Sequence, residues 1–140
     1  MILDALNKAY SSAKVKGWNT IYIGVDIHDT IVKANYDTTS IPKVWLNGAK
    51  EALQFLSLRK DIKLILYTCS HNNEIAQYIK WFKDNSIVFI DANRNGEVPN
   101  TALGCYDNKP YFNLLFDDKA GFVESDWYIV SNFFKNFPEL

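Results

Sequence analysis

Residues 21–31 read IYIGVDIHDTI, and this stretch decides the fold. Its first five residues are a short apolar, β-prone run that stops at Asp26, as a buried strand of a parallel sheet does. In an extended backbone, the i to i+2 spacing places Asp26 and His28 on one side, while Ile27 faces the core. The stretch therefore predicts a buried parallel strand with two polar side chains at its carboxyl end.

Helical and extended stretches alternate outward from this strand. This alternation predicts an α/β fold: a single doubly wound parallel sheet with helices on both faces, joined by right-handed crossovers. With 140 residues, the chain is expected to form one domain over residues 1–140. Amphipathic helices are expected over residues 3–16 (ended by Gly17), after an Asn47 cap, over 72–84 and after a Ser125 cap, with further strands over 62–67, 87–90 and 112–116.

Composition excludes several classes of function. Fifteen basic and sixteen acidic side chains give a net charge of -1, so the basic footprint of a general nucleic-acid binder is missing. No apolar run approaches the ~20 residues of a membrane span, and the start does not read as a secretory leader. Two cysteines do not make a disulfide framework. We expect a soluble cytoplasmic protein with no membrane partner, and the sequence does not fix its oligomeric state.

Polar side chains follow every predicted strand. In open parallel sheets, ligands bind beyond the carboxyl ends of the strands. Clustered carboxylates repel one another unless a cation lies among them, and oxygen ligands of this kind suit Mg²⁺. Thr68 and a lysine such as Lys109 would add a hydroxyl and a positive charge for phosphoryl oxygens. The strand-end residues are Asp26, His28, Thr68, Asp91, Asp117 and Asp118.

Four motifs in order resemble the haloacid dehalogenase superfamily of phosphotransferases, over residues 21–118. The first is IYIGVDIHDTI, where the family has a strand followed by its nucleophilic Asp. The second is the strand-end LILYTCS, the third is the lysine in NKPYF, and the fourth is the acidic strand end in NLLFDDKAGF. Each motif alone is weak. Together, in order and at strand ends, they are fairly specific.

The resemblance implies a Mg²⁺-dependent phosphatase that hydrolyses phosphomonoesters. In such an enzyme, Asp26 attacks phosphorus and becomes an aspartyl phosphate, which splits one difficult hydrolysis into two steps. The resemblance also implies that Mg²⁺ is held by Asp26, the backbone carbonyl of His28 and Asp117. Asp118 would serve as a further ligand or would position water.

The resemblance also implies roles for the remaining site residues and an expected size for the substrate. Thr68 and Lys109 would hold the transferring phosphoryl group, and Thr30 would support the nucleophile loop. The interval between Thr30 and Thr68 is filled by a helix and a strand, so no inserted cap domain fits there. Capless members of the family have open sites and often act on bulky or macromolecular phosphates. This implies an exposed cleft flanked by residues 33–46 and 91–104.

One position departs from the family pattern. The family's acid/base Asp is His28 here, followed by Asp29 where Gly is common. Histidine exchanges protons near neutral pH, so His28 is the predicted general acid and base, with Asp29 as the alternative. A second hypothesis is a module of the same fold that binds a phosphorylated ligand or partner without turnover. A phospho-accepting receiver is disfavoured, because receivers place the acidic pair after the first strand rather than the fourth.

Other polar residues have simpler interpretations. Asp91 is expected to cap a turn, and Lys109 has a competing interpretation as a solvated loop lysine, with Lys119 just past the acidic pair. Cys69 beside His71 has no identifiable third partner, which favours an incidental thiol over a nucleophile. A zinc site is disfavoured because the candidate ligands lack the short paired spacing of zinc motifs. These candidates are His28, Cys69, His71 and Cys105.

Overall fold

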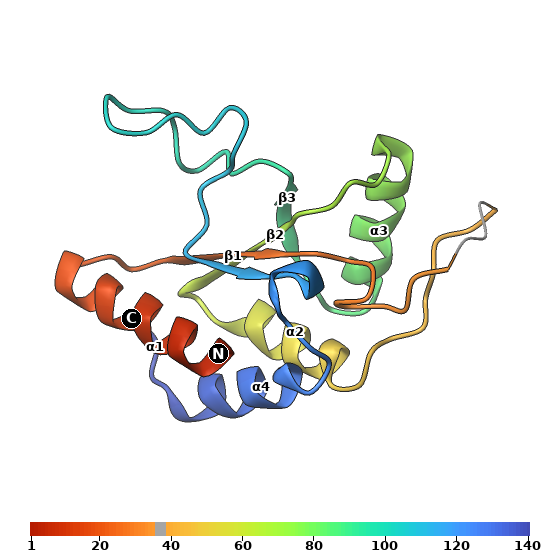
Figure 1. Ribbon diagram of the computed structural model, residues 1–140, viewed down its shortest axis with the longest axis horizontal. Coiled ribbons are helices and arrows are strands. Elements are labelled where there is room, and N and C mark those ends of the chain that lie inside the picture. The colour runs from red at the N-terminus through yellow and green to blue at the C-terminus, as the bar shows by residue number, and fades with distance from the viewer. Residues whose placement is uncertain (36–38) are drawn as a thin grey trace.

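The computed structural model describes residues 1–35 and 39–140 and has an α/β architecture (Figure 1). Within these residues, four strands form one sheet in the order β3-β2-β1-β4, and all neighbouring strands are parallel. The expected parallel α/β fold is therefore confirmed. The strands are β1 (Ile21–Val25), β2 (Ile62–Leu66), β3 (Phe89–Ala92) and β4 (Leu114–Phe116). The helices are α1 (Ile2–Lys16), α2 (Ala49–Leu58), α3 (Asn72–Asp84), the short 3-10 helix η1 (Asp118–Ala120) and α4 (Asp126–Asn136).

The helices flank the sheet. In Figure 1, α1, α2 and α4 lie together below it, with α4 packed against both α1 and α2, while α3 stands beside β3. Alternate β1 side chains, such as Ile21 and Ile23, are fully buried in the core. Within residues 1–35 and 39–140, no helix combines the length and the apolar character that crossing a membrane requires.

The segment between β3 and β4 covers part of the opposite face of the sheet. It leaves β3, loops away from the helices and returns to β4 (Figure 1). The Tyr22 hydroxyl donates to Glu97 at 3.0 Å, and the Phe112 ring packs on Gly24. A Cβ atom at Gly24 would lie 2.8 Å from that ring. The glycine in β1 is therefore required by this close approach of an aromatic ring to the backbone.

Two strands begin later than the sequence predicts. β3 spans Phe89–Ala92 rather than 87–90, and Asp91 therefore lies inside the strand and not after it. The apolar Ile87 is fully buried, but its backbone N–H bonds to Phe82 at the end of α3 instead of joining the sheet. β4 likewise begins at Leu114 rather than at residue 112. In both cases the apolar run begins before the first residue that pairs with a neighbouring strand, because apolar character reflects burial rather than strand pairing.

The predicted helix ends are correct in part. Gly17 ends α1 in the left-handed conformation, with φ of 69°, as glycine at this position commonly does. The Asn47 cap is wrong: α2 starts after Gly48, whose φ is 83°, and the Asn47 N–H donates to Glu124. Ser125 occupies the cap position of α4, but its side chain makes no capping hydrogen bond.

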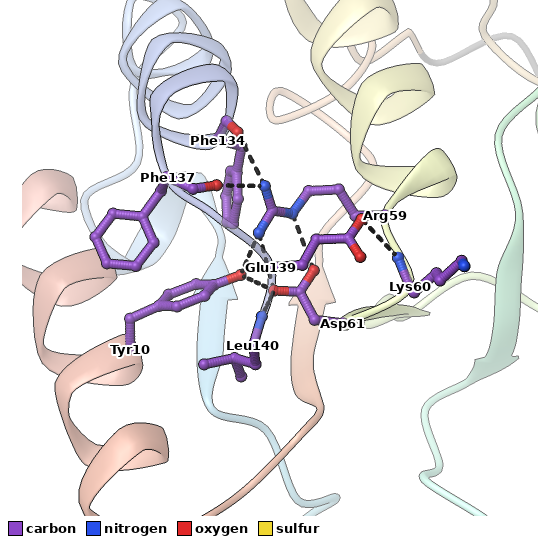
Figure 2. A network of polar contacts seen from close by, with 8 residues as sticks. All are labelled: Tyr10, Arg59, Lys60, Asp61, Phe134, Phe137, Glu139 and Leu140. Carbon is purple, nitrogen blue, oxygen red and sulfur yellow. Dashed lines mark hydrogen bonds and ion pairs between the residues drawn. The ribbon is translucent and has the colours of Figure 1, made fainter.

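A buried polar network lies at the amino ends of the strands, away from the site described below (Figure 2). Arg59 donates to both carboxylate oxygens of Asp61 at 2.9 Å, and its Nη1 donates to the carbonyls of Phe134 and Phe137. The Tyr10 hydroxyl donates to Asp61 at 2.7 Å. This Arg59 network joins α1, the α2–β2 connection and the end of α4.

Candidate functional site

Three carboxylates converge at the carboxyl ends of β1 and β4. Asp26 follows β1, while Asp117 and Asp118 follow β4, and the two strands are parallel neighbours. The Asp26 N–H donates to the carbonyl of Phe116 at 2.9 Å, which continues the ladder to the strand ends. One carboxylate oxygen of each Asp lies within 4.8 Å of the others, and all three residues are half-buried. We call these three residues the carboxylate cluster.

Thr30 fixes the geometry of the cluster. It is 1% exposed, and its hydroxyl donates to Asp26 Oδ2 at 3.2 Å while accepting the Asp118 N–H at 3.0 Å. The Thr30 carbonyl accepts a hydrogen bond from the indole of Trp127, a fully buried residue of α4, at 2.8 Å. One threonine thus joins the loop after β1 to the loop after β4 and anchors both to the core.

Negative charge is disfavoured at Asp26 when no cation is bound. Burial, followed by the charge of Asp117, raises the pKa of Asp26 to about 7. A hydrogen bond with the side chain of Asp118 acts in the same direction, and the Thr30 hydroxyl acts against it. A cation among these oxygens would remove the cause of the shift, because it favours the ionised carboxylate.

This shift predicts how stability depends on pH in the metal-free protein. The folded-state pKa of Asp26 lies above its ordinary value of 3.8, so its proton stabilises the fold at low pH, and that stability is lost as pH rises toward 7. Because Asp26 is only half-buried, solvent screening reduces the effect to about 1–2 kcal/mol. Urea unfolding between pH 5 and pH 8 should show this loss in the wild type and not in Asp26→Asn. An equal loss in both would contradict it.

Thr68 lies beside the cluster and is held by a residue that sequence reasoning missed. The Thr68 N–H donates to Asn93 Oδ1 and the Asn93 amide donates to the Thr68 carbonyl, both at 2.8 Å. Asn93 follows β3 with a left-handed φ of 56°, a conformation that asparagine tolerates. The Thr68 hydroxyl shares a 2.8 Å hydrogen bond with Ser70. Asn93 has the residue type and the position after a strand that mark a candidate, but the sequence pattern places the end of β3 too early and so puts Asp91 in that position.

A cavity of about 350 Å³ opens at these strand ends. It brings Asp26, Thr68 and Asp117 together with Lys119, the residue just past the acidic pair. Lys109 is exposed and does not line the cavity, although its neighbours Asn108 and Pro110 do. The full lining is Asp26, Tyr67, Thr68, Cys69, Asn93, Asn108, Pro110, Asp117 and Lys119.

His28 does not line this cavity. Its Nε2 lies 2.8 Å from the hydroxyl of Tyr78, a fully buried residue of α3. Asp29 takes a left-handed φ of 59°, and its carboxylate accepts the Ala34 N–H at 2.9 Å. The side chain of Asp29 therefore stabilises the turn, and Asp29 is not a member of the carboxylate cluster.

The remaining candidate residues are dispersed. His71 occupies the cap position of α3, Cys69 is exposed at the cavity, and Cys105 is exposed beside Asp107. Across residues 1–35 and 39–140, the side chains that lie close enough together to hold a metal ion are those of the carboxylate cluster, and His28, Cys69, His71 and Cys105 are not among them. Of the two segments expected to flank a cleft, 91–104 contributes Asn93 to the cavity, while 33–46 includes residues 36–38, which lie outside the described residues.

Comparisons with known proteins support the fold and name no activity. No family model and no curated protein matches the chain. A solved structure of a conserved protein from Bacteroides thetaiotaomicron is similar to it, with a TM-score of 0.64 and 27% sequence identity. The match covers 84% of this chain and 91% of that chain. The likeness therefore extends over most of the α/β architecture.

Proposed function

We propose that this chain is a Mg²⁺-dependent phosphatase of the haloacid dehalogenase type, with a single doubly wound domain over residues 1–140 and no cap. The observation that supports this function is that the carboxylate cluster, Thr68 and Lys119 meet at the carboxyl ends of adjacent parallel strands. Ligand sites in open α/β sheets lie at such strand ends. A cap-free cleft favours a bulky or macromolecular phosphomonoester as the substrate.

The donor set of the cluster fits Mg²⁺. Three half-buried carboxylates meet with no histidine or cysteine among them, and hard oxygen ligands suit Mg²⁺ rather than softer metals. Asp26, Asp117 and the backbone carbonyl of His28 would hold the ion, with Asp118 as a further ligand or a partner for water. When bound, Mg²⁺ would neutralise charge on the phosphoryl oxygens.

The chemistry of the proposed reaction uses residues of this chain in two steps. A carboxylate oxygen of Asp26 attacks phosphorus while the bond from phosphorus to the leaving oxygen breaks, and that oxygen takes a proton from a general acid. Water then attacks the aspartyl phosphate and gives a proton to the same group, now a base, which releases phosphate and restores Asp26. The Thr30 hydroxyl orients Asp26, and Thr68 and Lys119 would bind the phosphoryl oxygens.

The test of the function is Mg²⁺-dependent phosphate release from p-nitrophenyl phosphate. We expect turnover with Mg²⁺, loss of turnover with excess EDTA, and recovery when Mg²⁺ is restored. A wild type that releases no phosphate at any pH between 5 and 9 would contradict the proposal.

A binding module without turnover is the second candidate, and one observation favours it. His28 stands in the acid/base position but contacts Tyr78 and does not line the cavity. If the wild type is inactive and His28→Asp creates turnover, the chain is a binder of phosphorylated ligands on a phosphatase framework. A titration of inorganic phosphate with Mg²⁺ would then measure the retained affinity.

The contact between His28 and Tyr78 leads to a separate prediction about protonation of the leaving oxygen. Burial, with the charge of Glu74 adding to it, raises the pKa of Tyr78 to about 12, so its hydroxyl stays protonated near neutral pH and can hold the His28 ring. We expect His28→Ala to slow alkyl phosphate hydrolysis by about 10²-fold, and nitrophenyl phosphate hydrolysis much less, because nitrophenolate needs little protonation. Tyr78→Phe should show the same preference with a smaller effect. Unchanged alkyl phosphate hydrolysis in His28→Ala would exclude His28 as the acid.

The two lysines make a further prediction. The family pattern selects Lys109, whereas the cavity contains Lys119. We expect Lys119→Ala to reduce kcat/KM for p-nitrophenyl phosphate by about 10²-fold, because a charge-assisted contact to the phosphoryl group is lost. Lys109→Ala, an exposed neighbour of the cavity, is the matched control, with an expected change below threefold. The reverse ranking would return the phosphate-binding role to Lys109.

A further inference from the structure

A second cavity, of about 460 Å³, lies at the other end of β1. Its walls include Trp18 from the α1–β1 turn, Tyr22 from β1 and Tyr111 from the segment before β4. About 13 Å of strand separates Tyr22 from Asp26, and the two cavities share no lining residue. This second cavity, here called the aromatic cavity, is therefore separate from the proposed phosphatase site.

The three rings of the aromatic cavity are arranged as perpendicular walls. Tyr111 meets Trp18 at a centroid distance of 6.4 Å and an angle of 84°, and it meets Tyr22 at 6.2 Å and 82°. The face of an aromatic ring carries negative potential. Rings at right angles around one space present this potential from more than one direction, which is how aromatic cages recognise quaternary ammonium groups.

Two charged side chains lie beside these rings: Glu97 favours a bound cation, and Lys16 opposes it. Glu97 accepts the Tyr22 hydroxyl at 3.0 Å and forms no ion pair within the described part of the chain. Its negative charge therefore adds to the potential of the Tyr22 ring. On the neighbouring side, Lys16 Nζ lies 4.6 Å from the Trp18 centroid and lines an adjoining cavity, not this one. Trp18 thus already contacts one cation of the protein itself.

We propose that the aromatic cavity binds a small alkylated ammonium ion through the faces of Trp18, Tyr22 and Tyr111. Alkylation matters because a trimethylammonium group is larger and more weakly hydrated than a bare ammonium, so it fills an aromatic space at a lower desolvation cost. The trimethylammonium group is common to free choline and to trimethylated lysine, and the geometry fits the group itself.

The decisive experiment compares choline with its neutral isostere 3,3-dimethylbutan-1-ol by isothermal titration calorimetry on the full chain. We expect choline to bind about tenfold more tightly, because both fill the same volume and only choline carries the charge. N,N,N-trimethyllysine amide, titrated in parallel, identifies the source: the tighter of the two cations is the nearer analogue of the natural ligand. Equal affinity for choline and the alcohol, or no choline binding, overturns the proposal.

Variants test the role of each wall. Trp18→Leu keeps an apolar side chain but removes the aromatic face, and it should weaken choline binding about tenfold, with Trp18→Phe close to the wild type. Lys16→Met should strengthen choline binding about threefold, because it removes a like charge from the same indole. Weaker binding in Lys16→Met, or no loss in Trp18→Leu, contradicts the cation–π assignment.

Glu97→Gln provides a test that does not disturb packing. Glu97 is exposed, and glutamine can still accept the Tyr22 hydroxyl while removing the negative charge. Choline binding should weaken about twofold to threefold, and binding of the neutral alcohol should not change. If Trp18→Leu proves unstable, Glu97→Gln alone tests the proposal. An equal change in affinity for choline and for the neutral alcohol, or no change for choline, overturns the electrostatic part of the proposal.

Discussion

Asp26→Asn is expected to reduce phosphomonoester turnover by about a thousandfold or more, and excess Mg²⁺ is expected to restore none of it. The reason is covalent: in the proposed reaction Asp26 is the nucleophile, and an amide in its place does not form the aspartyl phosphate at any Mg²⁺ concentration. The variant should still fold, because Asp26 is half-buried and the asparagine oxygen can still accept the Thr30 hydroxyl. Steady-state hydrolysis of p-nitrophenyl phosphate across a Mg²⁺ series measures the effect.

Asp117→Asn separates the metal from the nucleophile. Asp117 is proposed to hold Mg²⁺ without attacking phosphorus, so its replacement should weaken Mg²⁺ affinity and be partly rescued by excess Mg²⁺. Asp4→Asn, on the exposed face of α1, is the control and should leave the Mg²⁺ dependence unchanged. Equal rescue of the Asp26 and Asp117 variants would contradict the assignment of roles. Beryllium fluoride bound to the Asp26 carboxylate, standing in for the aspartyl phosphate, would be the matching structural result.

The regular elements could be predicted where local pattern and tertiary packing agree. Residues 21–25 and 72–84 match β1 and α3 to the residue, because strand-type and helical apolar spacing coincide with burial there. The start of β3 could not be placed, since Ile87 packs into the core without pairing. The same holds for Phe112, whose ring covers Gly24 from outside the ladder.

The site could be predicted to the level of strand ends, and no further. Parallel strands bring their carboxyl ends to one edge, so the meeting of Asp26 with Asp117 follows from topology alone. Contacts across that edge depend on loop conformation, which periodicity does not encode. This is why the family pattern selects Lys109, whereas Lys119, noted in the sequence only as the residue just past the acidic pair, lines the cavity. Tyr78 likewise has the spacing of a core residue on α3, and nothing in that spacing indicates its hydrogen bond to His28.

Asp61→Asn is expected to lower the free energy of unfolding by about 3–5 kcal/mol, the largest loss of stability that we expect from a single polar substitution in this chain. Arg59 and Asp61 are 8% and 2% exposed, so the variant leaves a guanidinium buried without its counter-charge. Burial opposes ionisation of Asp61, but hydrogen bonds from Arg59 and Tyr10 lower its pKa. The stability it contributes is therefore present above its ordinary pKa and is lost as pH falls below that value.

Urea unfolding at pH 7 and at pH 3 measures both parts of this prediction. The difference between the wild type and Asp61→Asn should be large at pH 7 and should shrink at pH 3. That pH lies below the ordinary pKa of 3.8, so the Asp61 carboxyl of the unfolded chain is mostly protonated there and must lose its proton on folding. Lys60→Ala is the matched control, because the Lys60 side chain is exposed and only its backbone N–H contacts Glu139. The double variant Arg59→Met, Asp61→Leu should recover much of the loss, since the cost lies in the unpaired charge rather than in the missing pair. A loss below about 1 kcal/mol in Asp61→Asn at pH 7 would show that the Arg59 network does not hold the end of α4 to the sheet.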